Sequence, residues 1–328
     1  MCILLSSTEH PDYPFILLSN RDEFFRRPTE PADFRDTEDG KVKILAPLDL
    51  ARPEHGTWIG AATDGKLAVL LNFREENYSE SYSEISRGII PLDYLKSGDI
   101  SVDEWVKNLE TSISKERGVD PKEEYPLRKV GGFTLMYGNL SLESNGKISH
   151  LNILSNRGDR GKVHVPIDSD VALLDADIGH KTTFGLSNSL YSNPWPKVNL
   201  GEELLSKAIK YSIVRRENLQ ELVTSCFEVL STDTLSQEMA SDKTQDFTAK
   251  MMELKKSIFI PPVESGFEIA IGSNPTIGRY YGTRTQTVIV LDKEGELHYF
   301  EKNIQTSDVL TEGEVEVKHF HFPIRKNK

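Results

Sequence analysis

The first third of the chain consists of short apolar runs separated by polar and turn-forming residues, a pattern typical of β-strands. Its first two runs are predicted to pair as antiparallel strands around a turn that contains Pro11 and Pro14. A second hairpin is predicted where two runs flank Asp64-Gly65, a dipeptide that favours tight hairpin turns. The four predicted strands are Cys2–Ser6, Phe15–Ser19, Thr57–Thr63 and Lys66–Asn72.

Helical periodicity begins after this β-rich part. Ser86 is a candidate N-cap for a short helix that runs to Leu95. Ser101 and Glu104 have the spacing of a capping box, and an amphipathic pattern follows them. The later predicted elements are strands at Gly132–Leu140 and Ile148–Ser155, helices at Leu200–Val214 and Asn218–Ser231, a hairpin of Thr285–Asp292 and Glu296–Lys302, and a C-terminal strand with His319 and His321.

The order of these elements is strands, helices, strands, helices and strands. Clustered strands with separate helix pairs favour an α+β layered sandwich over the strict alternation of a doubly wound parallel sheet. We expect residues 1–328 to form a single domain, with a polar loop or insertion at about residues 232–256.

The composition is that of an ordinary globular protein, since 38% of the 328 residues are hydrophobic and 27% are charged. The formal net charge of −12 opposes binding to phosphate backbones, so no nucleic-acid partner is expected. The first residues lack the basic region of a signal peptide, and no apolar run approaches the ~18 residues of a transmembrane helix. The expected location is the cytoplasm, with any mitochondrial or Golgi association made through partners or an atypical signal.

Two cysteines, Cys2 and Cys226, fit a reducing compartment better than a disulfide framework. Cys226 falls on the apolar face of a predicted helix, so we expect it in the core. Removal of Met1 would leave Cys2 at the N-terminus with a thiol nucleophile and its own α-amine as a neighbouring base. The alternative is that Cys2 is simply a small apolar residue at the start of a strand.

The five polar residues from Ser19 to Glu23 are predicted to end the second strand, because such a run does not extend a buried strand. Asp22 can accept a hydrogen bond from the α-ammonium group of Cys2, and Arg21 can stabilise the thiolate. The alternative is that Arg21 and Asp22 form a surface ion pair of little consequence for stability.

Asn20-Arg21-Asp22-Glu23 is the tetrapeptide that names the NRDE family, also called the transport and Golgi organisation 2 family. Further blocks resemble those of the family in the same order: MCI at the N-terminus, GTWIG at 56–60, LLNF at 70–73, GLSN at 185–188, NPW at 193–195 and YGTRTQTVIVLD at 281–292. On these blocks the chain is identified as a member of the family. The resemblance implies haem trafficking, lipid or acyl-CoA handling, or Golgi organisation.

The family in turn resembles the N-terminal-cysteine hydrolases, which include bile-salt hydrolase and penicillin V acylase. This resemblance implies a four-layer αββα sandwich of the N-terminal-nucleophile (Ntn) hydrolase type, with Cys2 as the nucleophile and Asp22 beside it. It also implies that the amides of Asn72 and Asn188 stabilise an oxyanion, a role worth roughly 3 kcal/mol or more. Arg284 is the candidate for a late arginine of those enzymes.

One position departs from the hydrolase pattern. These hydrolases carry an arginine three residues before the aspartate, where this chain has Ser19, and the arginine of this segment is Arg21. If the strand stays regular, Ser19 and Arg21 share a face and the guanidinium can reach the site from the next rung. If the strand turns, the hydrolytic site is incomplete.

Other residues of the family blocks are candidates for ligand contacts. Asn20 and Glu23 complete the tetrapeptide, and Trp58 and Trp195 are candidates for lining a pocket. The alternative for both tryptophans is a structural role beside glycine or proline. The eight histidines are scattered without the spacing of metal ligands, so no metal site is predicted.

Three functions are open at this point. In the first, the chain carries an amphipathic small molecule such as haem, acyl-CoA or a lipid, and the Cys2 thiolate or a histidine is the ligand if haem is the cargo. In the second, Cys2 hydrolyses an acyl amide or an acyl thioester while Arg21 and Asp22 orient it. In the third, the chain is a scaffold of the secretory pathway without a ligand. None of these functions requires a cofactor.

Overall fold

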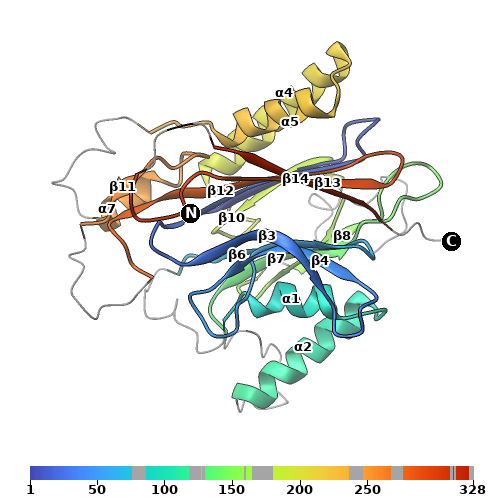
Figure 1. The fold of residues 1–328 in the computed structure, drawn as a ribbon, viewed down its shortest axis with the longest axis horizontal. Coiled ribbons are helices and arrows are strands. Elements are labelled where there is room, and N and C mark those ends of the chain that lie inside the picture. Colours follow the sequence, from blue (N-terminus) through green and yellow to red (C-terminus); the bar gives the residue numbers. More distant parts are fainter. Residues whose placement is uncertain are drawn as a thin grey trace.

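Two antiparallel sheets of seven strands each lie at the centre of the computed structural model of this chain (Figure 1). The structure describes residues 1–75, 86–117, 127, 130–158, 160–164, 180–235, 247–266, 276–310, 313 and 315–324. Among these residues, no helix is long and apolar enough to cross a membrane.

The first sheet has the N-terminal strand in its interior. Its strands are β1 (Ile3–Ser7), β2 (Phe15–Phe24), β10 (Thr183–Ser187), β11 (Val263–Glu264), β12 (Tyr280–Leu291), β13 (Glu296–Asn303) and β14 (Val317–Pro323). They run in the order β10-β1-β2-β12-β13-β14, and β11 pairs with β12. β1 is buried along its whole length, because the second sheet covers one of its faces and helices cover the other.

The second sheet is a meander. Its strands are β3 (Thr29–Asp36), β4 (Lys43–Asp49), β5 (Ile59–Ala62), β6 (Lys66–Asn72), β7 (Phe133–Asn139), β8 (Leu151–Ser155) and β9 (Arg160–Val163). Each strand pairs antiparallel with the next one along the chain. Antiparallel neighbours need no crossover, so the helices of this half are free to pack on the outer face.

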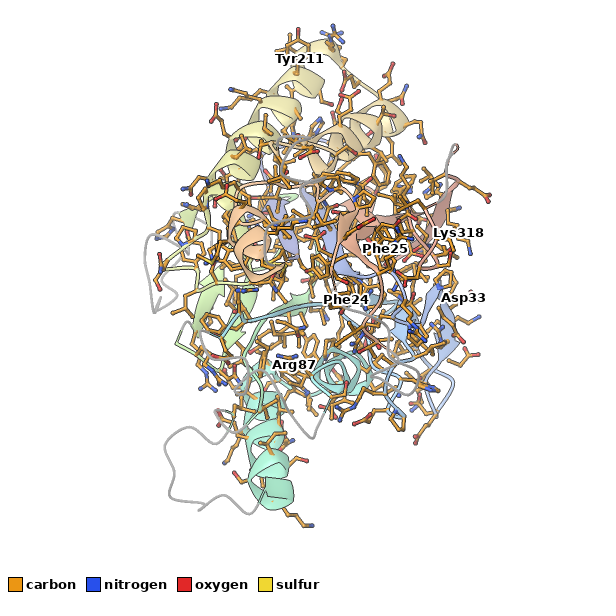
Figure 2. All side chains as sticks on the ribbon, turned by 90° about the vertical axis from the view of Figure 1, so that its left-hand side faces the viewer. Phe24, Phe25, Asp33, Arg87, Tyr211 and Lys318 are labelled. Carbon is orange, nitrogen blue, oxygen red and sulfur yellow. The ribbon has the colours of Figure 1, made fainter. Side chains whose placement is uncertain are left out.

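Helices cover the outer face of each sheet (Figure 1). α4 (Pro196–Arg215) and α5 (Leu219–Leu230) pack on the first sheet, and α1 (Ile89–Lys96) and α2 (Val102–Arg117) pack on the second. The short helix α7 (Phe247–Glu253) lies beside β11 on the side of the molecule that holds the N-terminus. Figure 2 shows Tyr211 at the outer end of the α4–α5 layer and the teal α2 at the opposite end.

Three buried apolar layers alternate with these four layers of secondary structure. Leu17 and Leu67 belong to the layer between the sheets, here called the inter-sheet layer. Ile16 and Cys226 belong to the layer under α4 and α5, and Trp105 belongs to the layer under α1 and α2. The arrangement confirms the predicted α+β fold, a four-layer αββα sandwich, and it confirms that Cys226 is in the core.

Most predicted elements form near their predicted bounds. β1 pairs with β2, and the second hairpin turns with Gly65 at a φ of 97°. The hydroxyl of Ser101 accepts a hydrogen bond of 3.2 Å from the backbone N–H of Glu104 at the start of α2. The C-terminal strand β14 includes His319 and His321, as predicted.

Other elements differ from the prediction. α1 begins at Ile89 with Gly88 as its N-cap, so Ser86 does not cap it. β3 and β4 have no predicted counterpart, because charged side chains on the exposed positions of β3 obscure its alternation. β2 continues to Phe24 and does not end at Ser19. Within the polar segment at about 232–256, α7 is helical, and residues 236–246 lie outside the described residues.

His164 is a buried histidine beside the inter-sheet layer. Its Nε2 lies 2.9 Å from Ser6 Oγ, and its ring centroid lies 4.8 Å from that of Phe184. Burial lowers the pKa of His164 from 6.5 to about 3, against a smaller raising effect of a backbone hydrogen bond at Lys181. The folded protein therefore holds this imidazole neutral at neutral pH.

Stability should fall as the pH falls below 6.5, because the unfolded chain takes up a proton on His164 that the folded chain refuses until about pH 3. One such group lowers the free energy of unfolding by about 1.4 kcal/mol per pH unit in this window. His164→Asn removes the titration, and asparagine tolerates the positive φ of 57° at this position. The free energy of unfolding, measured with urea at several pH values, gives its slope against pH. This slope should be smaller in the variant by about 1.4 kcal/mol per pH unit, which corresponds to one proton. Equal slopes in the two proteins would contradict the assignment.

Candidate active site

The position of Cys2 follows from the registers of β1 with its two neighbours. In the pairing of β1 with β2, Ile3 is opposite Asn20, so Cys2 is opposite Arg21 when the register is extended by one residue. The register of β1 with β10, extended in the same way, places Asn188 on the other side of Cys2. Residues from three strands therefore surround the thiol at one end of the first sheet.

Cys2 is half-buried and packs against the inter-sheet layer. Its Sγ lies 3.7 Å from the carbonyl oxygen of Asp22, and its own carbonyl oxygen accepts a hydrogen bond of 2.7 Å from Ser187 Oγ. The other cysteine, Cys226, is fully buried, and burial raises the pKa of its thiol to about 12. Cys2 is therefore the thiol that a substrate or ligand can reach.

The carboxylate of Asp22 is buried on the opposite face of β2, toward the helices. Thr283 Oγ1 donates a hydrogen bond of 2.7 Å to its Oδ1. Oδ2 lies 3.7 Å from Lys197 Nζ and 3.8 Å from the N-terminal nitrogen of Met1, and it accepts no hydrogen bond from the described residues. The oxygen that faces the N-terminus is thus held by ion pairs alone.

Lys197 lies in the first turn of α4 and is fully buried beside Asp22. Its Nζ donates to the carbonyl oxygen of Met1, which belongs to the peptide bond between Met1 and Cys2. Burial lowers the pKa of Lys197, and the charges of Asp22 and Cys2 oppose this effect. A buried amine with a lowered pKa beside a buried carboxylate is common in chemically active sites.

Met1 belongs to a buried apolar cluster at this end of the molecule. The members of this Met1 cluster are Met1, Trp195, Leu254, Ile260, Val263 and Tyr281. The hydroxyl of Tyr281 accepts a hydrogen bond from the Met1 nitrogen and donates one of 3.3 Å to the carbonyl oxygen of Asp22. Burial raises the pKa of Tyr281, so its hydroxyl stays protonated. The structure thus places the predicted ligand contact Trp195 next to the first residue of the chain.

Phe24 lies at the end of the molecule that holds the Met1 cluster, and Figure 2 shows it between the two helix layers. It packs against the Met1 cluster, with its ring centroid 5.3 Å from that of Tyr281 in an edge-to-face arrangement. The last residue of β2 therefore borders the same site as the first residue of the chain.

Arg21 lies between the two sheets together with Trp58. Its guanidinium carbon is 4.2 Å from the centroid of the Trp58 ring, and its Nη2 is 3.0 Å from Asp49 Oδ2. Glu23 Oε2 is 3.9 Å from the same nitrogen, and Arg27 Nε is 2.7 Å from Asp49 Oδ2. Burial raises the pKa of Asp49, but Arg21 and Arg27 outweigh burial and leave it lowered. These charges link the two sheets.

The two predicted oxyanion donors meet at the ends of β6 and β10. Asn188 Nδ2 donates to the main-chain carbonyl oxygen of Asn72, and Asn188 Oδ1 is buried without a hydrogen-bond partner among the described residues. Asn72 itself is exposed. Asn188 therefore flanks Cys2 directly, and Asn72 contributes its backbone to the position of Asn188.

Asn20 does not reach this site. Its side chain is fully buried on the helix side of β2, and its Nδ2 donates to the carbonyl oxygens of Leu230 and Ile258 over 2.8 and 2.9 Å. These bonds direct the amide nitrogen into the helix layer, so the structure gives the predicted ligand contact of Asn20 no support. Its role is to tie β2 to the helix layer.

Arg284 binds backbone carbonyl groups near the ends of β2 and β13. Its guanidinium donates to the carbonyl oxygens of Gln305, Phe24 and Arg27. Burial lowers the pKa of Arg284 to about 10, and the nearby charge of Arg21 adds to the effect. These bonds hold the turn after β2, which is a positioning role, and the catalytic role of Arg284 stays a prediction.

The polar run after Ser19 stays in the strand because its side chains find partners on both faces of the sheet. Asn20 and Asp22 are satisfied on the helix side. Arg21 and Glu23 are satisfied on the other side. The prediction that polar residues end the strand is wrong because these partners come from segments distant in the sequence. Since the strand stays regular, Ser19 and Arg21 share a face. This is the alternative in which the Arg21 guanidinium can reach the site from the next rung of the sheet.

This arrangement provides a half-buried thiol, a buried carboxylate and a buried amine around one peptide bond. These are the groups of covalent acyl transfer, in which a thiolate attacks a carbonyl carbon and neighbouring groups move the proton. The part of the chain that the structure describes contains no group of three or more His, Cys, Asp or Glu side chains placed for one metal ion.

A family model described as Transport and Golgi organisation 2 matches residues 1–306 of this chain. The chain belongs to the Transport and Golgi organisation 2 family. The Transport and Golgi organization protein 2 homolog of Bos taurus is 29% identical over 297 residues, which cover 90% of this chain and 88% of the relative. The uncharacterised protein YGR127W of Saccharomyces cerevisiae is 26% identical over 319 residues, which cover 94% of this chain and 93% of the relative.

Two solved structures have similar chains. The N-acylethanolamine-hydrolyzing acid amidase ortholog of Caenorhabditis elegans has a TM-score of 0.41 and 11% identity, with 88% of this chain and 92% of that chain covered. A conjugated bile acid hydrolase of Clostridium perfringens has a TM-score of 0.33 and 11% identity, with 100% of this chain and 99% of that chain covered.

Three residues of the site are not among the sequence predictions. Lys197 lies two residues after the NPW block of the Transport and Golgi organisation 2 family, and a lysine on the inner face of an amphipathic helix is the signal that points to it. Tyr281 and Thr283 lie inside the YGTRTQ block of the family. Their alternation on one face of β12 is the corresponding signal.

Asp22→Asn should lower the free energy of unfolding by about 3 kcal/mol, because it leaves the Lys197 ammonium buried without its carboxylate. Adding Lys197→Met should recover a large part of this loss, since methionine fills similar space without a charge. Urea unfolding at pH 7 of the wild type, both single variants and the double variant completes the cycle. A coupling energy below about 0.5 kcal/mol would show that the two side chains are not linked energetically.

Proposed function

We propose that this chain is an N-terminal-cysteine hydrolase that cleaves an acyl amide or an acyl thioester once the Met1–Cys2 bond is broken. The observation that carries the proposal is the buried Oδ2 of Asp22, which faces the N-terminal amine and accepts no hydrogen bond from the described residues. Cleavage turns the nitrogen of Cys2 into an α-amine next to the thiol. Asp22 is the acceptor that can orient this amine.

In the proposed reaction, the α-amine of Cys2 takes the proton of the thiol, and the thiolate bonds to the carbonyl carbon of the substrate. Asn188, supported by Asn72, is the candidate donor to the oxyanion. The bond to the leaving nitrogen or sulfur then breaks, and the α-ammonium returns the proton to that atom. Water activated by the same amine releases the acid and restores the thiol.

The burial of charge supports a chemical role for the site. Asp22 and Lys197 are both fully buried at their side chains. Replacing a buried ion pair by well-packed apolar residues is often neutral or stabilising, so stability alone does not account for such a pair. Acyl transfer does account for it, because buried charges tune the groups that move protons.

Carriage of an amphipathic molecule such as haem, acyl-CoA or a lipid is the second candidate for the same site. Its support is the apolar Met1 cluster beside a half-buried thiol, since a cysteine thiolate is a known ligand of haem iron. Both candidates require a reduced Cys2, which fits the cytoplasm, with mitochondrial or Golgi association made through partners.

Cys2→Ala should lower the hydrolysis rate of acyl-amide and acyl-thioester probes by about 1,000-fold or more, because it removes the nucleophile. Cys226→Ala is the matched control and should leave the rate unchanged, since Cys226 is fully buried. Intact-mass analysis during turnover should show an acyl adduct on the wild type and on the control, but not on Cys2→Ala. Retention of Met1 in the active wild type would exclude the free-amine mechanism.

A haem titration separates the two candidates. If Cys2 is a catalytic nucleophile and not a haem ligand, the wild type and Cys2→Ala should give the same Soret spectrum. A Soret shift in the wild type that Cys2→Ala abolishes would support carriage of haem through the thiolate. The control Cys226→Ala should follow the wild type in either case.

A further inference from the structure

Met1 occupies the candidate site in the manner of a bound ligand. Its nitrogen donates to the Tyr281 hydroxyl and lies 3.8 Å from Asp22 Oδ2. Its carbonyl oxygen accepts from Lys197 Nζ, and its side chain lies in the Met1 cluster. The site therefore contacts three parts of Met1 at once: its amine, its carbonyl oxygen and its unbranched apolar side chain. Together these parts define an α-aminoacyl group.

The same aminoacyl group lies next to the candidate nucleophile. The carbonyl carbon of Met1 is bonded to the nitrogen of Cys2, so it is close to the thiol of that residue. An acyl group bonded to Cys2 Sγ would have its carbonyl carbon only a few bond lengths from this position. Met1 thus approximates the place that an acyl group takes in a covalent intermediate on Cys2.

We propose that, after cleavage of the Met1–Cys2 bond, the place of Met1 binds the acyl part of the substrate, which is an apolar α-amino acid with a free amine joined as an amide or a thioester. This inference rests on the proposed hydrolase function and names its substrate class. Asp22 and Tyr281 bind the amine, and Lys197 binds the carbonyl oxygen. Trp195 and the other apolar members of the Met1 cluster bind the side chain.

The carboxylate of Asp22 can accept hydrogen bonds from the substrate amine and from the amine of Cys2 at the same time. Its Oδ1 is occupied by Thr283, but its Oδ2 accepts no hydrogen bond from the described residues. A carboxylate oxygen has two lone pairs, so Oδ2 can accept one hydrogen bond from each amine.

A free amine is required because the surroundings of the Met1 nitrogen are closed. Met1 is 5% exposed, and its nitrogen is in contact with Tyr281 and near Asp22. An acyl group on the substrate nitrogen would remove the charge that pairs with Asp22 and would add atoms where the protein already fills the space. Such a substrate loses both the ion pair and the fit.

The covalent step balances within these groups. Cys2 Sγ bonds to the aminoacyl carbonyl carbon as the bond to the leaving amine or thiol breaks, and the leaving atom takes the proton that the Cys2 amine had removed from the thiol. Water then hydrolyses the S-aminoacyl intermediate to the free amino acid and restores the thiol. No other reactant is needed.

Binding to the processed but inactive protein tests the proposal. Cys2→Ala keeps a small second residue, so Met1 should be removed, and mass spectrometry checks that the chain begins at residue 2. Isothermal titration calorimetry then compares L-methioninamide, N-acetyl-L-methioninamide and glycinamide. L-methioninamide should bind, and glycinamide should bind more weakly by about tenfold or more because it buries no apolar side chain. The N-acetyl compound should not bind.

A charge variant adds a second measurement. In the Cys2→Ala background, Asp22→Asn should weaken binding of L-methioninamide by about tenfold or more, because a charge-assisted hydrogen bond is lost. Asp12→Asn is the matched control, since Asp12 pairs with Lys293 on the surface, and it should leave the affinity unchanged. Circular dichroism checks that both proteins are folded, and the comparison of the three ligands does not depend on either variant.

The outcomes separate this inference from the hydrolase function. Equal affinity for the free and N-acetylated compounds, or no binding of L-methioninamide, overturns the proposed substrate class. Wild-type hydrolysis of acyl amides without an α-amine, at the rate found with L-methioninamide, overturns the substrate class and leaves the hydrolase function standing. Binding of L-methioninamide without turnover by the wild type overturns the hydrolase function and leaves the aminoacyl site standing.

Discussion

The geometry of the site depends on the contacts of the buried Asp22 carboxylate. This carboxylate accepts a hydrogen bond from Thr283 of β12 and lies 3.7 Å from Lys197 of α4 and 3.8 Å from the nitrogen of Met1. A buried charge is costly unless charged or hydrogen-bonding partners surround it, so these elements tolerate little displacement from one another. One side chain thus fixes the start of the chain against a sheet and a helix that come from distant parts of the sequence.

The sheet supplies the position of the thiol through its register. β1 pairs with β10 on one edge and with β2 on the other, and it is buried on both faces. A slip of one residue in either pairing would turn Cys2 to the helix side and separate it from Arg21. Because both faces of β1 pack against apolar layers, such a slip would also exchange the side chains that pack in the two layers. The stability of the sandwich therefore protects the geometry of the site.

Features that depend on sequence neighbours could be predicted, and features that depend on distant partners could not. The hairpin at Gly65 and the hydrogen bond at Ser101 follow from residues within one turn, and both are found. The course of β2 beyond Ser19 depends on Asp49 and Lys197, which no local pattern connects to it. The family motifs supplied the identity of Cys2 and its neighbours, but they did not show which side chains of the motif point into the site and which, like Asn20, point into the helix layer.

The arginine and the lysine nearest to Cys2 in the sequence motif and in the fold lie on opposite faces of β2. Arg21 lies over Trp58, and its charge is matched by Asp49 in the space between the sheets. Lys197 approaches from the helix side instead, and the interaction with Cys2 is among the effects that oppose the lowering of its pKa. Lys197 is thus the cation beside Asp22 and the peptide bond between Met1 and Cys2, and it comes from α4, an element outside the motif. A comparison of the motif residue by residue does not include this cation.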